Sequence, residues 1–215
     1  LESATISEGL ESIGSHAFYN CSTLGEITLP DSVTTLGYMI FSGSKKLTNI
    51  NIPLNLSSCD WASGYYGPFG DSSITEATVP EGMKSIPAYT FGQCTKLENI
   101  VIPDSVTSIG QYAFSRCSLT SCTIGSGVTT IGDYAFYRCT GLSAIVIPDS
   151  VTEIGAWAFE VCSGLSSIVI PDNVTKISCA AFKECTELTS IVIHDSLIQI
   201  GIRAFEGCSG LTSIV

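Results

Sequence analysis

Apolar residues recur along the chain in one fixed order, at a spacing of 22 or 23 residues that widens once to 28. Relative to each marker Phe, Cys tends to follow at +3, Leu at +6, Ile at +9 and +11, Pro at +12, Val at +15 and Ile at +18, with Gly next. A fixed period of this length predicts stacked coils, because one unit cannot bury its apolar face alone. The nine markers are Phe18, Phe41, Phe69, Phe91, Phe114, Phe136, Phe159, Phe182 and Phe205.

Within one unit the pattern predicts a strand, a turn and a short helical segment. In residues 145–147 the alternation directs two Ile inward and Val146 outward, as a strand requires. Pro148 ends this strand because it lacks the N–H that a ladder uses, and Asp149 and Ser150 turn the chain. Residues 156–162 are predicted to form one short helical turn.

The expected fold is a leucine-rich-repeat solenoid of about nine coils of 22–23 residues. A parallel β-sheet is expected on one face, with short helical turns and irregular segments opposite. Residues 1–215 are expected to form a single leucine-rich-repeat domain with an irregular insertion at about residues 56–70, where five extra residues widen the spacing. Because Leu1 already occupies a repeat position and the chain ends at a strand position, we expect the segment to be excised from a longer repeat protein.

Seven of the ten Cys occupy the same repeat position, which argues against a disulfide framework. In stacked coils these side chains form a parallel ladder with rungs ~4.8 Å apart, whereas a disulfide needs Cβ atoms about 3.5–4.5 Å apart that turn toward each other. Ser44 and Ser72 replace Cys twice, so free buried thiols are expected. No Cys-x-x-Cys pair occurs, and His16 and His194 lie at opposite ends of the array, so we expect neither a metal site nor a cofactor.

The outward strand position is the first candidate for partner binding. Along the chain it changes from mostly polar to mostly Val, and Val146, Val169 and Val192 lie beside small residues, which makes a flat and mildly apolar strip. The alternative is β-propensity alone, since Val suits a half-exposed strand. The full row is Thr28, Asn51, Thr78, Val101, Thr123, Val146, Val169, Val192 and Val215.

A second candidate row stands two residues before each marker Phe. Four successive members are aromatic, and they are expected either to stack and support the array or to present a surface for protein or glycan. These four are Tyr89, Tyr112, Tyr134 and Trp157.

The insertion is the third candidate, because Trp61, Tyr65 and Tyr66 occur there in a Gly-rich setting. Inserted loops in repeat arrays fall on one face and often bind partners. The alternative is an irregular coil whose aromatic residues only cover a disrupted core.

Charge and chemistry narrow the functional class. Nine Lys and Arg against twenty Asp and Glu give a net charge of −11, which opposes binding to nucleic acid. No apolar run reaches the roughly 18 residues that a membrane-spanning helix needs, so this segment is not expected to insert into a membrane. Neither His has an obvious Ser or Cys partner for nucleophilic catalysis, and we therefore expect no enzyme activity.

The repeated phrase Cys-x-x-Leu-x-x-Ile-x-Ile-Pro-x-Ser-Val-Thr-x-Ile-Gly-x-x-Ala-Phe resembles the BspA-like, or Treponema pallidum-type, leucine-rich repeat. The resemblance covers nearly the whole chain, with residues 56–70 as the one serious departure. It implies a bacterial cell-surface or secreted protein with a role in adhesion to host or microbial surfaces. It implies no catalytic residues.

These observations together predict a non-catalytic protein-binding or adhesion module that binds a protein or glycan. The alternative is a structural spacer array that presents other domains and has no ligand of its own. The repeat leaves the oligomeric state open.

Overall fold

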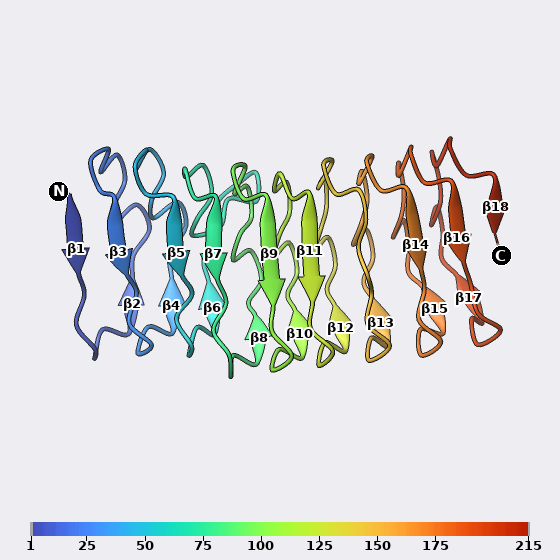
Figure 1. The fold of residues 1–215 in the computed structure, drawn as a ribbon, viewed down its shortest axis with the longest axis horizontal. Coiled ribbons are helices and arrows are strands. Elements are labelled where there is room, and N and C mark those ends of the chain that lie inside the picture. The colour runs from blue at the N-terminus through green and yellow to red at the C-terminus, as the bar shows by residue number, and fades with distance from the viewer. Residues whose placement is uncertain (1, 215) are drawn as a thin grey trace.

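The computed structural model describes residues 2–214, through which the chain winds as one continuous stack of coils. The two ends of the chain lie at opposite ends of the stack (Figure 1). Neighbouring coils are joined by short parallel strands, with Ile100 opposite Cys122 and Ile168 opposite Ile191. The solenoid expected from the repeat is therefore confirmed. Leu1 and Val215, which the repeat places at a Leu and a strand position, lie outside the described residues.

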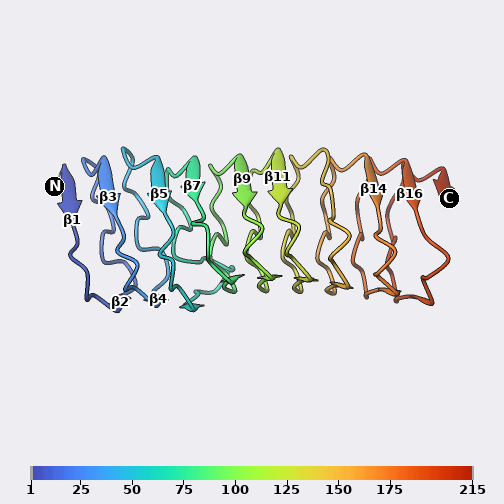
Figure 2. The same ribbon diagram turned by 60° about the horizontal axis from the view of Figure 1, so that its bottom comes forward.

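The predicted Ile-x-Ile strands form one row along the stack (Figures 1 and 2). The coil that contains Val146 passes through this row without a defined strand, although residues 145 and 147 are buried there as in its neighbours. The row comprises β1 (Ser3–Thr5), β3 (Glu26–Thr28), β5 (Asn49–Asn51), β7 (Glu76–Thr78), β9 (Asn99–Ile102), β11 (Ser121–Ile124), β14 (Ser167–Val169), β16 (Ser190–Val192) and β18 (Ser213–Ile214).

A second row of two-residue strands follows the Pro-Asp turn, where the sequence predicted only inward-facing positions. Its residues pair in parallel with the same positions of adjacent coils, as in Ile109 opposite Ile131. The row comprises β2 (Ser12–Ile13), β4 (Thr35–Leu36), β6 (Ser58–Cys59), β8 (Ser85–Ile86), β10 (Ser108–Ile109), β12 (Thr130–Ile131), β13 (Glu153–Ile154), β15 (Lys176–Ile177) and β17 (Gln199–Ile200).

Residues 156–162 form linked turns, and the prediction of a helical turn there was wrong. Trp157 and Val161, two residues on either side of Phe159, have positive φ values of 56° and 60°. The amides of Trp157, Phe159 and Val161 donate to carbonyls of the next coil, while the amides between them donate within their own coil. An α-helix would use its amides within its own segment, so the pairing with the next coil replaces it.

The marker Phe side chains form a continuous ladder inside the stack. Seven of the nine are fully buried, and consecutive ring centroids lie 5.2–6.1 Å apart. The widest step, from Phe41 to Phe69, spans the insertion, and the next step to Phe91 is tilted by 32°. The core therefore runs through the insertion with a local offset.

The thiol ladder has a hydrogen-bonding role that explains the repeated Cys. The thiol of Cys139 donates to the carbonyl of Phe114 in the preceding coil at 3.1 Å. Ser44, at the same repeat position, donates to the carbonyl of Phe18 at 2.8 Å. All ten Cys are unpaired, in agreement with the predicted free thiols. The same bond is made by Cys117, Cys162, Cys185 and Cys208.

Thr side chains form two further ladders between coils. The hydroxyl of Thr129 donates to the carbonyl of Thr107 at 3.1 Å, beside the second strand row. The hydroxyl of Thr212 donates to the carbonyl of Thr189 at 3.1 Å, beside the first row. These residues satisfy backbone carbonyls of the preceding coil, and this explains why the repeat retains Thr at exposed positions.

Candidate binding surface

The insertion forms a tight loop that is fixed to the body of the stack. Ala62 and Tyr66 make an isolated antiparallel bridge, and the amide of Ala62 donates to the carbonyl of Tyr66 at 3.0 Å. Gly64 and Tyr65 have positive φ values of 91° and 71°, which closes the turn. The side-chain amide of Gln93 donates to the carbonyl of Gly64 at 2.7 Å. The loop is therefore anchored by a residue of the next coil.

The loop places two of its aromatic rings on the aromatic row of later coils. Trp61 stacks on Tyr89 with centroids 5.0 Å apart, and Tyr65 stacks on Tyr112 with centroids 4.4 Å apart. Tyr112 is only 7% exposed, whereas Trp61 is 51% exposed. The insertion and the aromatic row, which the sequence offered as separate binding candidates, thus form one structure.

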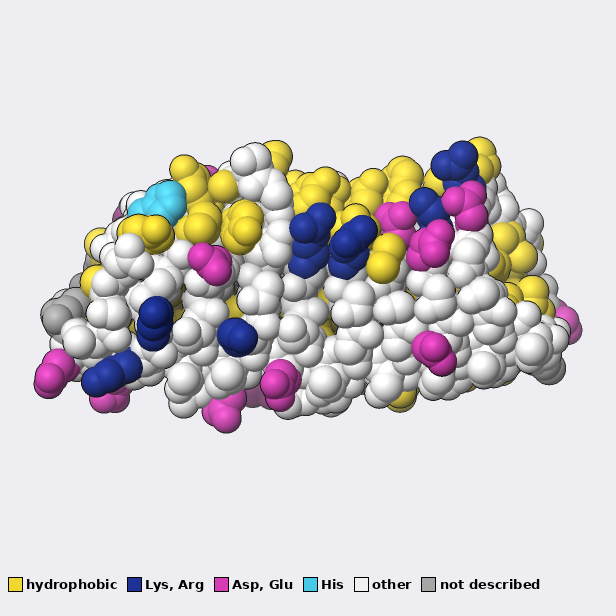
Figure 3. Space-filling view, turned by 90° about the horizontal axis from the view of Figure 1, so that it is seen from above, with side chains coloured by type: hydrophobic (Ala, Val, Ile, Leu, Met, Phe, Trp, Pro, Cys, Tyr) yellow, Lys and Arg dark blue, Asp and Glu magenta, His cyan; other side chains and the backbone are white. Residues whose placement is uncertain are grey.

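The aromatic row itself is a stack of nearly parallel rings. Tyr89 lies 5.1 Å from Tyr112, Tyr112 lies 4.5 Å from Tyr134, and Tyr134 lies 4.9 Å from Trp157. Stacking therefore occurs as one alternative predicted, and the exposed parts of the rings still face outward. Figure 3 shows a hydrophobic band along this side of the molecule, with basic side chains beside it. We define the aromatic surface as Trp61, Tyr65, Tyr89, Tyr112, Tyr134 and Trp157.

Tyr66, the third aromatic residue of the insertion, has a different place. Its ring packs beside Gly64 and Gly70 of its own coil, and the side chain is half-buried. Tyr66 therefore supports the loop and is not part of the stacked row.

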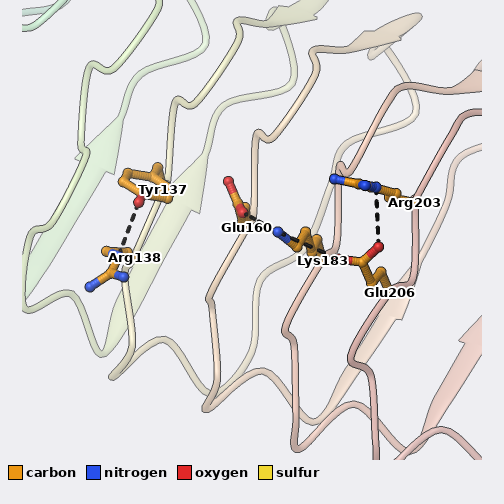
Figure 4. A network of polar contacts seen from close by, with 6 residues as sticks. All are labelled: Tyr137, Arg138, Glu160, Lys183, Arg203 and Glu206. Atoms are coloured by element: carbon orange, nitrogen blue, oxygen red, sulfur yellow. Dashed lines mark hydrogen bonds and ion pairs between the residues drawn. The ribbon is translucent and has the colours of Figure 1, made fainter.

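Two arginines and a tyrosine that the sequence reasoning missed border the aromatic surface. The Arg116 guanidinium lies 5.8 Å from the ring centroids of both Tyr65 and Tyr137. Arg138 lies 5.6 Å from the centroid of Tyr137 and donates through Nε to its hydroxyl at 3.0 Å (Figure 4). Arg116 and Arg138 both stand two residues after a marker Phe in consecutive coils, and this spacing was the available signal.

Beside these arginines lies a polar network in which acids and bases are paired. Lys183 contacts Glu160 at 3.3 Å and Glu206 at 3.6 Å, and Arg203 contacts Glu206 at 3.2 Å (Figure 4). The hydrogen bond to Glu160 raises the pKa of Lys183, so its charge is retained at neutral pH.

Three tyrosines of the row, Tyr89, Tyr112 and Tyr134, are neutral hydrogen-bonding groups at physiological pH. Burial raises the pKa of Tyr112 well above its usual range, and burial also raises the pKa of Tyr89 and Tyr134. Phenols in this state donate and accept hydrogen bonds without adding charge to the surface.

The Val strip forms a separate surface on the first strand row. Val101, Val146 and Val169 are 64%, 80% and 55% exposed, whereas Val192 is half-buried. Toward the N-terminus the same row becomes polar, with a shallow hollow lined by Glu26, Asn49, Asn51, Glu76 and Thr78. Val146 and Val169 are exposed as predicted, Val192 is less so, and the insertion does not contribute to this strip.

The repeated strand, turn and Phe ladder have the form of a known repeat family. The sequence pattern of the BspA type leucine-rich repeat region matches residues 1–63, 65–189 and 175–215 in six copies. The chain belongs to this family. Among residues 2–214, no helix has the length and apolar character that crossing a bilayer would require.

Solved structures of bacterial leucine-rich repeat proteins resemble the chain. One from Bacteroides ovatus is 32% identical, with a TM-score of 0.66, and the match covers 99% of this chain and 60% of that one. A leucine rich cell surface protein from Faecalibacterium prausnitzii is 25% identical, with a TM-score of 0.57, over 100% of this chain and 69% of that one. The chain thus spans 60% of the length of the first relative.

The pneumococcal vaccine antigen PcpA shares the fold at 17% identity and a TM-score of 0.53, over 99% of this chain and 71% of that one. A comparison with curated proteins found no match.

Proposed function

We propose that this BspA type repeat is a non-catalytic binding module that attaches a bacterial cell-surface or secreted protein to a protein or glycan on a host or microbial surface. The contact is made by the aromatic surface. The similarity to a leucine rich cell surface protein from Faecalibacterium prausnitzii supports the location.

The observation that carries the proposal is the path of the inserted loop. Tyr65 belongs to the coil of Phe69, yet it stacks on Tyr112, two coils further along. A loop that only repaired its own coil would have no need to reach that far. The result is a contiguous aromatic platform with Trp61 half-exposed, and Trp and Tyr are the residues that dominate binding energy at interfaces.

The proposal includes no catalysis. The imidazole of His194 pairs with Asp172 at 2.7 Å, and His16 packs edge-on against Tyr19 and Tyr38. In residues 2–214 neither imidazole bonds a Ser or Cys that it would activate as a nucleophile.

A spacer role is the second candidate, and the continuous Phe ladder favours it. From the coil of Phe91 to that of Phe205, each junction repeats the same ring stacking and the same thiol bond, which suits a rigid rod. A spacer would make no use of the exposed Trp61. Only the binding function therefore predicts that removing this side chain weakens binding.

A capture assay tests the proposal. The purified protein is presented to arrays of matrix proteins, mucins and glycans, and the affinity for any bound molecule is measured for wild type and Trp61→Ala. We expect the substitution to weaken binding about tenfold or more, since buried interface Trp typically contributes over 1.4 kcal/mol. The thermal midpoint should change little, because half of this side chain is already exposed.

Tyr19→Ala is the matched control, since Tyr19 is 50% exposed and lies in the coil of Phe18, outside the aromatic surface. It should leave binding unchanged. If Trp61→Ala and Tyr65→Ala both bind like wild type, the aromatic surface is not the contact. If wild type binds nothing on these arrays, the spacer function is favoured.

A further inference from the structure

Arg116 and Arg138 are two cations in consecutive coils that the molecule leaves without an acidic partner. No ion pair within residues 2–214 includes either guanidinium, whereas Lys183 and Arg203 nearby are both paired. Their own contacts are to Tyr65 and Tyr137. The arrangement fixes two positive charges beside the aromatic surface in a chain of net charge −11.

Two acidic groups of neighbouring coils are already engaged elsewhere. Glu160 is held by Lys183 at 3.3 Å, and Asp133 accepts the amide of Ala156 at 2.7 Å. The same repeat position holds Val161 in the next coil and Glu184 in the coil after that. An uncharged residue therefore lies between Arg138 and Glu184. Arg116 and Arg138 therefore carry positive charges beside the aromatic surface that no ion pair within residues 2–214 neutralises.

Arg116 also retains an unused hydrogen-bond donor. Its Nε is buried and has no partner, while the guanidinium lies between the rings of Tyr65 and Tyr137. Arg138 is exposed and uses Nε for the Tyr137 hydroxyl, which orients the rest of its guanidinium. The tyrosine rings thus orient the two guanidinium groups. A guanidinium donates two parallel hydrogen bonds, so this arrangement suits a planar anion that accepts through two oxygen atoms.

We propose that Arg116 and Arg138 bind a carboxylate of a short protein segment that lies along the aromatic surface. This inference rests on the proposed function and adds the chemistry of the partner. With strands ~4.8 Å apart, the row from Tyr89 to Trp157 spans about 15 Å, which is the length of roughly five extended residues. One or two Asp or Glu side chains would meet the arginines while apolar side chains contact Trp61 and the row.

The charge of the whole chain favours a short peptide over a polyanionic glycan. A long polyanion would meet the repulsion of the remaining acidic surface, whereas a segment with one or two carboxylates meets only the local arginine pair. Trp, Tyr and Arg, the three residue types gathered here, are also those that concentrate at the centres of protein interfaces.

Selection from a library of random 12-residue peptides on the immobilised protein tests the inference. Enriched peptides should carry Asp or Glu within a few residues of an aromatic or aliphatic side chain. The affinity of one selected peptide should fall about tenfold or more with Arg138→Gln, and similarly when its acidic residue is replaced by the amide. The two changes combined should cost no more than either alone, as expected for direct partners.

Arg203→Gln is the control, because it removes the same charge from an arginine that is already ion-paired. It should change the affinity by less than about threefold. Arg138→Lys keeps the charge without the fork and should give an intermediate affinity. Arg138 is exposed, so its variants remain folded even if Arg116→Gln is destabilising, and the thermal midpoint verifies this.

Enriched peptides without acidic residues, or equal affinity for wild type and Arg138→Gln, would overturn the inference. Binding to sialylated or sulfated glycans in place of peptides would overturn it as well. A partner whose binding falls with Trp61→Ala but not with Arg138→Gln would leave the proposed function standing and refute only the arginine site. Binding that neither substitution changes would refute both.

Discussion

At the scale of the residue, the repeat determines which buried side chains are exchangeable. Ser44 replaces Cys because its hydroxyl makes the same bond to the preceding Phe carbonyl. Cys122 is different, since it occupies an Ile position opposite Ile100, and burial alone raises its pKa to about 12. This thiol is therefore a small apolar core residue that can be replaced by a hydrocarbon.

Cys122→Val should reduce the loss of stability at alkaline pH. The unfolded thiol ionises near pH 8.5 and the folded one near 12, so its contribution is complete below about pH 8.5 and is lost as the pH rises toward 12. Urea unfolding between pH 7 and 11 should show a shallower decline for the variant, by up to about 1.4 kcal/mol per pH unit. At pH 7 the two free energies of unfolding should agree within about 1.5 kcal/mol. Equal slopes would show that this thiol is not protected in the fold.

At the scale of the coil, close backbone contact sets the distance between neighbours. A Cβ on Gly155 would lie 2.5 Å from the amide nitrogen of Asp133 in the preceding coil. Gly14 occupies the same repeat position in the first described coil, and a Cβ there would meet nothing within 4 Å. The repeated Gly is thus required by the junction and not by the turn itself.

Gly155→Ala should destabilise the protein by at least about 2 kcal/mol, because a backbone atom must move to admit the methyl group. Gly14→Ala is the internal control and should cost less than about 1 kcal/mol. Chemical unfolding of both variants provides the measurement. Similar losses at the two positions would mean that the spacing of the coils is not limited by this contact.

The inward half of each coil was predictable from sequence because a single rule governs it. Ile145, Ile147 and Phe159 recur at fixed spacings, and each is buried as expected. The turn was not predictable, because Trp157 adopts positive φ only to let alternate amides bond the next coil. Local propensity contains no information on that bonding.

For the candidate site, the aromatic residues were identified but their meeting was not. Trp61 reaches Tyr89 because Gln93 fixes the loop, and one Gln side chain produces no periodic signal. Arg116 and Arg138 recur at one repeat position, but that spacing alone does not show that Arg116 meets the ring of Tyr65, which the loop brings from another coil.

At the scale of the whole molecule, stability is a sum over junctions between neighbours. Phe136 is fully buried between Phe114 and Phe159, at 5.3 and 5.2 Å. Phe205 is half-buried and has a single described ring neighbour, Phe182 at 5.7 Å. Removing the Phe136 ring therefore eliminates ring contacts on both sides, whereas removing the Phe205 ring eliminates one described ring contact.

Phe136→Ala should cost about 3–5 kcal/mol, and Phe205→Ala should cost less than half as much because it opens only one junction. Amide hydrogen exchange should show faster exchange in the coils on both sides of Phe136, but only near the C-terminus for Phe205. Uniform loss of protection in both variants would indicate that the array unfolds as one cooperative unit.

The ladder in which Cys117, Cys139, Cys162, Cys185 and Cys208 each bond the Phe carbonyl one coil earlier has an evolutionary consequence. The junctions from the coil of Phe91 to that of Phe205 repeat the same donors and acceptors, so a coil inserted or deleted there as a whole unit finds compatible neighbours on both sides. Recombination that adds or removes a whole unit would therefore yield foldable proteins of new length. The outward-facing residues of each unit would be carried intact into a new order.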